Sequence, residues 1–487
     1  GILVKKTIAF IISIVISTCG GEFVYAKTAY GVSRISGANR YETSVNIANS
    51  FSSDKLENVI IASGNNFPDA LVGSVLSRKE NAPILLVGKD VSSSGDSINF
   101  IKNKLDREET IYILGGKSSV SENFESYFNS LGYSSVKRLG GKNRFDTNFV
   151  IDRYLMTEKG TPVVIVNAYG FADALSVSSI AASKGYPIIM TDSFNLADET
   201  KETLKNIEPS KVFIIGGKSS VTDNIVSQLK EIVPSLNSDN IIRIGGMNRY
   251  DTSLNVCKYF NQTSNEAVIA SGENFPDALS AGALAARNNA PIILTNGANI
   301  SDQKQYLDGC NCEKVILIGG TGAVSEDVQN ALEGKTVISD EDAKKLLLQG
   351  DDAFKKILKI NVDGNSYMDV SGISYAPVTD NIGEYNSISE YLNENYELNN
   401  YYTNNFVNTL INFVFKDIDG KVYMRYGNPE PALTVEDSEV VSKKYNDNKA
   451  DIILKGYYYG ELSYANATLV YDGNRWLIDR FDNWGVE

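Results

Sequence analysis

The chain has 487 residues, with 46 Lys and Arg, 60 Asp and Glu, and no histidine, which gives a formal net charge of -14. This length suits three or four domains, and the absence of histidine excludes Ser-His-Asp and Cys-His catalysis and the commonest zinc ligand. The acidic excess lies mainly after residue 339, where 25 acidic and 14 basic residues occur. Neither part of the chain has the basic excess typical of nucleic-acid-binding proteins.

The first residues have the pattern of a secretory signal. Lys5 and Lys6 precede an apolar run over residues 7–17, and small residues end at Ala26. We therefore predict a signal peptide over residues 1–26 and a secreted protein. The run is too short for a dependable membrane span, and we expect no later span either. A lipid anchor at Cys19 is the less favoured alternative, because threonine is a poor residue just before it.

A long repeat organises the next three hundred residues. The stretch Ser-Gly-Asn-Asn-Phe-Pro-Asp-Ala-Leu, which starts at Ser63, returns in variant form at Asn167 and Ser271. Its aspartates Asp69, Asp173 and Asp277 are 104 residues apart. A period of this length indicates a whole domain in three copies rather than a solenoid unit. We place the copies at residues 32–136, 137–241 and 242–336.

Each copy alternates helical and strand patterns. In the first, we predict helices over residues 41–51 and 68–79 and a helical piece that ends at 105, with strands over 59–62, 84–87 and 111–114. Short, continuously apolar strands between helices are typical of a parallel sheet covered on both faces. We predict an α/β fold in three tandem copies that pack on one another, because almost no linker separates them.

The sequence does not predict a cofactor or a metal site. One glycine-rich stretch, residues 320–325, approaches a dinucleotide-binding loop, but it lacks the third glycine and occurs in one copy alone. A phosphate-binding loop ending in Gly-Lys-Ser or Gly-Lys-Thr does not occur. The four cysteines are too few for a disulfide framework.

Four motifs together resemble a known family. They are Ile-Ser-Gly-Ala-Asn-Arg-Tyr-Glu-Thr, Phe-Pro-Asp-Ala-Leu, Ala-Pro-Ile-Leu-Leu and Tyr-Ile-Leu-Gly-Gly-Lys-Ser-Ser-Val-Ser. In this combination they resemble the clostridial type-2 cell-wall-binding repeat over residues 32–336. The resemblance implies three α/β domains in a pseudo-threefold arrangement. It also implies non-covalent attachment to an anionic, teichoic-acid-like polysaccharide of the Gram-positive wall, alongside or within the surface layer.

The resemblance also implicates one short run in attachment. In this sequence the run comprises Pro83, Ile84, Leu85, Leu86, Pro187, Ile188, Ile189, Met190, Pro291, Ile292, Ile293 and Leu294. Its composition is that of a buried strand, so a role in supporting the following loops is favoured over direct contact. The second copy departs from the pattern, with Ala168, Ala172 and Met190 in place of Gly64, Pro68 and Leu86.

Arg40, Arg144 and Arg249 are the better candidates for direct contact with the polymer. A guanidinium group binds an oxyanion with two parallel hydrogen bonds. The alternative is a structural pair with the aspartate of the same motif set. The sequence leaves open whether three local sites or one composite groove would hold the polymer.

An acidic α+β domain is predicted over residues 340–487. Helical patterns at 339–358, 387–392 and 406–413 precede strand patterns at 422–426, 451–459, 462–471 and 475–481, with a hairpin turn at 472–474. The layout loosely resembles the secreted inhibitors of peptidoglycan DL-endopeptidases and the cone-shaped α+β ligand-binding domains. The inhibitor resemblance implies a domain that blocks a wall hydrolase, with acidic loops among residues 417–439. A solvated acidic face is the plainer interpretation of these loops.

Three hypotheses for the function follow. The first is a non-enzymatic protein of the cell wall or surface layer, anchored by the repeats to the anionic polysaccharide and displaying a domain that inhibits or binds a wall DL-endopeptidase. The second is a structural surface-layer or adhesion protein. The third, and least favoured, is a wall hydrolase, because no catalytic constellation stands out. The expected partners are the polysaccharide and a peptidoglycan hydrolase or a surface-layer protein, without nucleic acid.

Overall fold

The computed structural model describes residues 29–262, 264–427 and 429–487. The chain divides into two compact units, with the boundary between Lys335 and Thr336. The predicted signal peptide and the alternative anchor at Cys19 lie outside the described residues. Within those residues, no helix has both the length and the apolar character that a membrane span requires.

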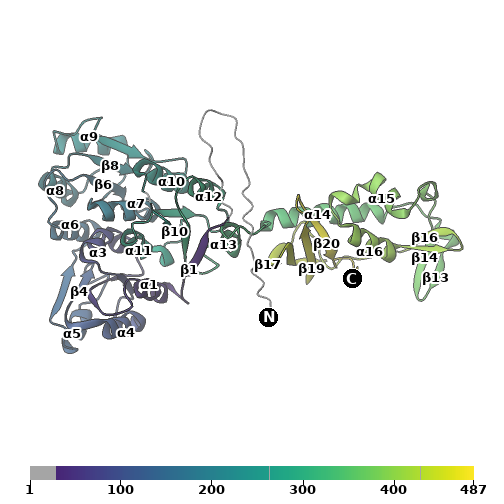
Figure 1. The fold of residues 1–487 in the computed structure, drawn as a ribbon, viewed down its shortest axis with the longest axis horizontal. Coiled ribbons are helices and arrows are strands. Elements are labelled where there is room, and N and C mark those ends of the chain that lie inside the picture. The colour runs from purple at the N-terminus through teal and green to yellow at the C-terminus, as the bar shows by residue number, and fades with distance from the viewer. Residues whose placement is uncertain (1–28, 263, 428) are drawn as a thin grey trace, which may run out of the picture. The chain divides into compact units, whose positions relative to one another are not determined.

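Three four-stranded parallel sheets form the first unit (Figure 1). The strand orders are β3-β2-β4-β5, β7-β6-β8-β9 and β11-β10-β12-β1, so the three sheets are equivalent. Their strands are β1 (Gly31–Ile35), β2 (Leu56–Ser63), β3 (Ile84–Val87), β4 (Leu105–Leu114), β5 (Ser135–Leu139), β6 (Val163–Asn167), β7 (Ile188–Thr191), β8 (Val212–Ile215), β9 (Ile241–Ile244), β10 (Glu266–Ser271), β11 (Ile292–Thr295) and β12 (Lys314–Ile318). The parallel α/β repeats predicted from the sequence are confirmed.

Helices connect these strands and cover the sheets. They are α1 (Arg40–Asn49), α2 (Pro68–Val72), α3 (Ser74–Glu80), α4 (Gly95–Lys104), α5 (Asn123–Ser130), α6 (Arg144–Tyr154), α7 (Phe171–Lys184), α8 (Asp198–Ile207), α9 (Asp223–Ile232), α10 (Arg249–Phe260), α11 (Ala281–Arg287), α12 (Ser301–Asp308) and α13 (Glu326–Leu332), with 3-10 turns η1 (Val91–Ser93) and η2 (Pro276–Ala278). The helix predicted over residues 68–79 divides at Gly73 into α2 and α3.

The edge strand of each sheet closes the repeats into a ring. Strand β5 starts the second repeat in sequence but completes the sheet of the first, and β9 does the same for the second sheet. The third sheet is completed by β1, whose Gly31 and Ile35 pair with Lys314 and Ile318 of β12. The start of the first repeat therefore belongs to the sheet of the third, which the sequence patterns did not indicate.

The three repeats meet along a pseudo-threefold axis. Helices α3, α7 and α11 pack on one another there, and their equivalent residues Ser74, Ser178 and Gly282 converge. A Cβ atom at Gly282 would lie 2.4 Å from Ser178 Oγ and 3.2 Å from Ser74 Oγ. The axis therefore holds two small side chains at this level and has no room for a third.

The second unit has two four-stranded antiparallel sheets, β13-β14-β16-β15 and β17-β18-β19-β20. Its elements are α14 (Asp340–Ile357), η3 (Gly364–Ser366), β13 (Met368–Val370), β14 (Ile373–Pro377), η4 (Ile382–Glu384), α15 (Ile388–Tyr396), η5 (Leu398–Asn400), α16 (Asn404–Val414), β15 (Phe415–Ile418), β16 (Lys421–Arg425), β17 (Glu439–Asn446), β18 (Lys449–Tyr458), β19 (Glu461–Tyr471) and β20 (Trp476–Phe481). The α+β class is confirmed. The expected order of helices first is wrong in one respect, because β13 and β14 precede α15 and α16.

A buried aspartate ties the two ends of the second unit together. Asp351 of α14 accepts hydrogen bonds from Asn483 Nδ2 at 3.1 Å and from Trp484 Nε1 at 2.7 Å. Lys355 Nζ lies 3.2 Å from its other oxygen. A buried carboxylate needs such donors and a nearby cation to offset its lost hydration.

We expect Gly282→Ala to lower the free energy of unfolding of the first unit by about 1–3 kcal/mol, because the new methyl group overpacks the axis. Thermal unfolding followed by far-UV circular dichroism measures the change. Both tryptophans lie in the second unit, so an unchanged fluorescence transition is the internal control. In the double variant Ser178→Gly/Gly282→Ala the loss should be smaller than the sum of the single losses. Full additivity would contradict the proposed crowding.

Candidate functional site

The Asn-Arg motif starts a helix at each junction between repeats. Asn39, Asn143 and Asn248 are the N-cap residues of α1, α6 and α10, and each side chain accepts a hydrogen bond from a backbone N–H in the first turn. Asparagine suits this position because its short side chain satisfies an otherwise unpaired N–H group. Because the cap fixes the start of the helix, it also fixes the position from which the side chain of the following arginine extends.

The three arginines of this motif each join two neighbouring repeats. Within its own repeat, Arg144 Nη1 donates to the carbonyl of Ala168 at 2.6 Å, and Arg40 and Arg249 donate to Gly64 and Gly272 in the same way. Across the junction, each guanidinium lies over a phenylalanine of the preceding repeat. The distances from Cζ to the ring centroid are 5.8 Å for Arg40 on Phe275, 5.6 Å for Arg144 on Phe67 and 5.8 Å for Arg249 on Phe171.

These phenylalanines also contact one another. The ring centroids of Phe67, Phe171 and Phe275 are 5.9–6.3 Å apart in all three pairs. Because the residues are equivalent in the three repeats, this axial phenylalanine cluster surrounds the pseudo-threefold axis. The three arginines therefore ring an aromatic cluster, and guanidinium groups are attracted to aromatic faces. Sequence reasoning missed the cluster, although the phenylalanines share the 104-residue spacing of the motif.

The motif aspartates lie beneath the same junctions. Burial raises the pKa of Asp69 from 3.8 to about 6, although Arg144 of the next repeat opposes the shift. Burial likewise raises the pKa of Asp173 to about 6, opposed by a hydrogen bond from Ser220 and by Arg249. Arginine and aspartate thus interact across a junction rather than within one repeat. At the remaining junction, Thr43 Oγ1 donates to Asp277 at 3.2 Å.

Each aspartate packs against a Gly-Gly turn of its own repeat. The first glycines, Gly115, Gly216 and Gly319, have φ angles of +111°, +114° and +103°. A Cβ atom at Gly115 or Gly216 would lie 2.7 Å from the aspartate Oδ2, so any larger residue would collide there. From the edge strand, Arg138, Arg243 and Arg34 donate to the carbonyls of these glycines at 3.0, 3.1 and 2.9 Å.

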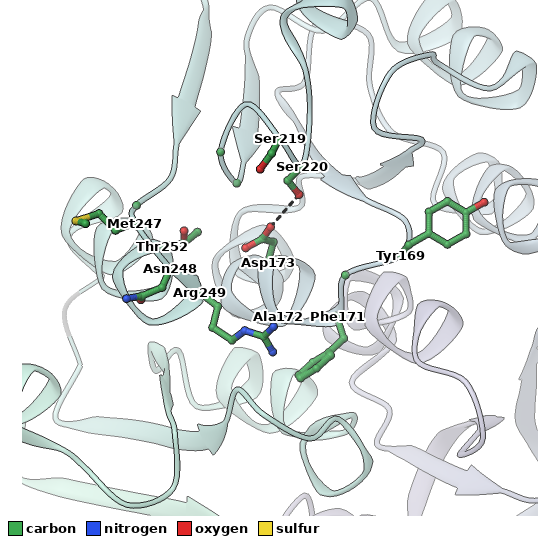
Figure 2. A pocket seen from close by; sticks show the side chains of 14 residues that line it. Tyr169, Phe171, Ala172, Asp173, Ser219, Ser220, Met247, Asn248, Arg249 and Thr252 are labelled. Carbon is green, nitrogen blue, oxygen red and sulfur yellow. Dashed lines mark hydrogen bonds between the residues drawn. The ribbon is translucent and has the colours of Figure 1, made fainter.

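A pocket opens at the second junction, between repeats 2 and 3 (Figure 2). Its volume is about 450 Å³. In Figure 2, Asp173 lies between Ser220 and Arg249, and Met247 lies on the opposite side of the pocket from Tyr169. The lining comes from residues 169–173 at the start of α7, from the Gly-Gly turn and the two serines near it, and from residues 246–252 at the start of α10.

The equivalent region of the first junction, between repeats 1 and 2, holds two adjoining pockets. One has a volume of about 240 Å³ and includes Asp69, Ser119 and Arg144 in its lining. The other has a volume of about 450 Å³ and is lined in part by Lys117 and Arg138. Both include Gly116, Ser118, Gly141 and Lys142, so these four residues separate the two pockets. Sequence reasoning did not single out either lysine.

The apolar run implicated in attachment is buried in all three repeats. Every residue of strands β3, β7 and β11 is buried, and so are the prolines before these strands. The backbone N–H groups of Leu86, Met190 and Leu294 donate to Ser44, Asn148 and Ser253 of α1, α6 and α10. These contacts hold each arginine-bearing helix against its sheet. Any effect of the run on polymer binding would therefore act through support of the junction.

The acidic residues predicted for loops of the second unit are accessible, although Asp417 lies in β15 and Glu439 begins β17. Asp417, Asp419, Glu430, Glu436, Asp437 and Glu439 all have exposed side chains. Among the described residues, none of the six forms an ion pair within the unit. No group of three or more carboxylates and cysteines suited to a metal ion occurs in the described part of the chain.

Two protein families match this chain. Residues 34–125, 138–226 and 243–329 match cell wall binding domain 2 (CWB2), and residues 334–483 match the IseA DL-endopeptidase inhibitor family. The resemblances to wall-binding repeats and to endopeptidase inhibitors are thereby confirmed, and the match favours the inhibitor class over the cone-shaped one.

An amidase and an amidase enhancer are among the relatives. The N-acetylmuramoyl-L-alanine amidase LytC of Bacillus subtilis is 32% identical over 65% of this chain and 62% of its own length. The amidase enhancer of the same organism is 27% identical over 67% of this chain and 44% of its own length. The chain thus covers less than two thirds of either relative. The solved structure of Cwp6 from Clostridium difficile matches with a TM-score of 0.57 and 26% identity, over 68% of this chain and 52% of that one.

We expect the double variant Asp69→Asn/Asp173→Asn to raise the free energy of unfolding of the first unit above pH 6. The difference from the unaltered protein should narrow as pH falls. The folded state keeps protons on these carboxyls up to about pH 6, whereas the unfolded chain releases them near 3.8. The contribution of these two carboxyl groups to the free energy of unfolding therefore declines as pH rises from 3.8 to about 6. Hydrogen exchange of β2 and β6 amides, compared at each pH, measures the gap.

The exposed Asp54→Asn is the control for loss of one surface carboxylate. A gap that is constant from pH 4 to pH 8 would contradict the prediction.

Proposed function

The chain belongs to the cell wall binding domain 2 family, and on this premise we propose that its first unit anchors it non-covalently to an anionic polysaccharide of the wall. The observation that carries the proposal is the repeated junction, where a guanidinium, a Gly-Gly turn and a helix N-terminus come together. Guanidinium groups and unpaired backbone amides both bind oxyanions. The first 339 residues carry 35 acidic and 32 basic residues, so local groups rather than net charge must attract the polymer.

Within this proposal the arginines and the apolar run have different roles. Arg144 and Arg249 line the pockets of their junctions, and all three arginines, including Arg40, retain donors beyond the one used by Nη1. Residues 83–86, 187–190 and 291–294 support the helices that carry these arginines. The match to cell wall binding domain 2 supports a location at the cell wall. Secretion through the predicted signal peptide would bring the chain there.

We propose that the second unit inhibits a wall DL-endopeptidase. The match to the IseA inhibitor family supports this activity. Six exposed carboxylates, four of them within residues 430–439, are available to interact with a basic cleft. An amidase activity like that named for LytC is the alternative. The absence of histidine from the sequence argues against it, since histidine is the usual general base and metal ligand in hydrolases.

Co-sedimentation of the full chain with purified Gram-positive walls tests the anchor. We expect the protein to pellet with untreated walls, to stay in solution with walls stripped of anionic polymers by acid, and to dissociate as salt is raised. Equal binding to stripped and untreated walls, or no binding to either, would refute the proposed polymer attachment.

Digestion of peptidoglycan by a DL-endopeptidase, with the full chain added in increasing amounts, tests the inhibitor. We expect the rate of digestion to fall to a plateau at stoichiometric inhibitor. The variant Glu430→Gln/Glu436→Gln/Asp437→Asn/Glu439→Gln should inhibit less and still bind walls, because these side chains are exposed and lie in the second unit. Unchanged digestion with the full chain would contradict inhibition, and release of muramic acid–alanine cleavage products by the chain alone would favour the amidase.

A further inference from the structure

We infer that the three junctions are unequal, and that the junction between repeats 1 and 2 is the principal site for an oxyanion of the wall polymer, with Lys142 as the residue that distinguishes it. This inference rests on the proposed anchoring function and specifies which part of the ring performs it. The sequence motifs are shared by all three repeats. The side chains that line the junction surfaces are not.

The basic side chains decrease in number around the ring. The first junction has Lys117 after its Gly-Gly turn and Lys142 before the N-cap, and both line its pockets. The second junction has Lys218 at the first of these positions but Met247 at the second, where the methionine is 97% exposed. The third junction, between repeats 3 and 1, has neither, with Thr321 and Ala38 at the equivalent positions.

The hydroxyl donors distinguish the third junction from the other two. The turns of the first two junctions continue with paired serines, Ser118–Ser119 and Ser219–Ser220, which line the pockets there. The third turn has Gly322 and Ala323 instead. A hydroxyl group can donate to an oxyanion, whereas these two residues offer backbone N–H groups alone. The third junction thus lacks the lysines and the paired serines of the first, and its turn has one hydroxyl donor, at Thr321.

A further carboxylate lies beside the second junction. It belongs to Glu273, an exposed side chain of the third repeat that accepts a hydrogen bond from Tyr250 in the first turn of α10, the helix that starts at this junction. One carboxylate in the first helical turn is common to all three junctions, at Glu42, Asp146 and Asp251. These shared carboxylates do not alter the gradient. An anion therefore meets the most favourable potential at the first junction.

Of the two lysines at the first junction, Lys117 forms an ion pair within the described part of the chain and Lys142 does not. Lys117 Nζ lies 2.9 Å from Glu122 Oε2 in an exposed ion pair, and Lys218 Nζ lies 3.3 Å from Asp223 at the second junction. No ion pair or side-chain hydrogen bond of Lys142 occurs among the described residues, and its side chain is exposed beside both pockets. Its backbone N–H donates to Asp146, which fixes the loop without using the ammonium group.

Backbone amides complete the first site. The N–H groups of Gly116, Lys117 and Ser118 make no hydrogen bond with any described residue, while the next N–H, of Ser119, donates to Gly116. Successive unpaired N–H groups in a turn form a concave anion-binding surface. Lys142 lines the same pockets, so an oxyanion there would meet these amides and an ammonium group together.

An exchange of the distinguishing residues tests the inference in the full chain. Co-sedimentation with untreated walls compares the unaltered protein with Lys142→Met and Met247→Lys over a range of protein and salt concentrations. We expect Lys142→Met to weaken binding and Met247→Lys to strengthen it, each by about fivefold, because one charge contact is removed or added. The dependence of log affinity on log salt should become shallower by about one for the first variant and steeper by about one for the second.

A matched control distinguishes a specific binding site from a general effect of net charge. Lys205→Met removes an exposed lysine of α8 and changes the net charge by the same amount. If Lys142→Met weakens binding no more than Lys205→Met does, or if Met247→Lys brings no gain, the inference is overturned while wall anchoring stands. If the unaltered protein fails to bind untreated walls, the anchoring function itself is refuted and this inference with it. Both exchanged side chains are exposed, so circular dichroism should show unchanged folding.

Discussion

The contact of each repeat with the next at the pseudo-threefold axis determines how the first unit is built. Three phenylalanines meet there, three arginines lie over them from the following repeats, and helices α3, α7 and α11 pack closely enough that one of three equivalent residues must be glycine. Because each arginine also bonds a carbonyl of its own repeat, it couples the end of its own sheet to the aromatic ring of its neighbour. A repeat cannot make these contacts alone, so the ring is the structural unit.

The same contacts position the groups that we propose for polymer binding. The guanidinium groups that hold the junctions together retain free donors. Each Gly-Gly turn is fixed by the aspartate packed beneath it and by the edge-strand arginine that donates to its first carbonyl. The apolar run at the end of each sheet is remote from solvent but fixes the helix that presents the arginine. Under the proposed anchoring function, stability and recognition use neighbouring atoms of one motif, which would explain why the motif combines buried and exposed residue types.

Equivalent backbones do not make equivalent sites. The three junctions share their turns, caps and arginines, yet the residues that face solvent beside them differ in charge from one junction to the next. Backbone geometry is constrained by the packing of the whole ring, whereas an exposed position such as Lys142 or Met247 contributes little to stability and is free to vary. The second unit likewise uses carboxylates in two ways. The buried Asp351 holds the two ends of the unit together, whereas other carboxylates are exposed to solvent.

The sequence alone determined the number and class of the domains. A period of 104 residues, short apolar strands and the shared motifs were sufficient to predict three parallel α/β repeats, and β3 lies at the very residues expected, 84–87. Local patterns reveal such elements because their side-chain periodicity is local. Tertiary structure decided the rest. Strand β1 joins the sheet of the third repeat, Arg144 faces Asp69 of the preceding repeat, and Lys117 comes to lie near Lys142 across a junction. These relations arise from ring closure, which brings together residues far apart in the chain and leaves no periodic signal in the sequence.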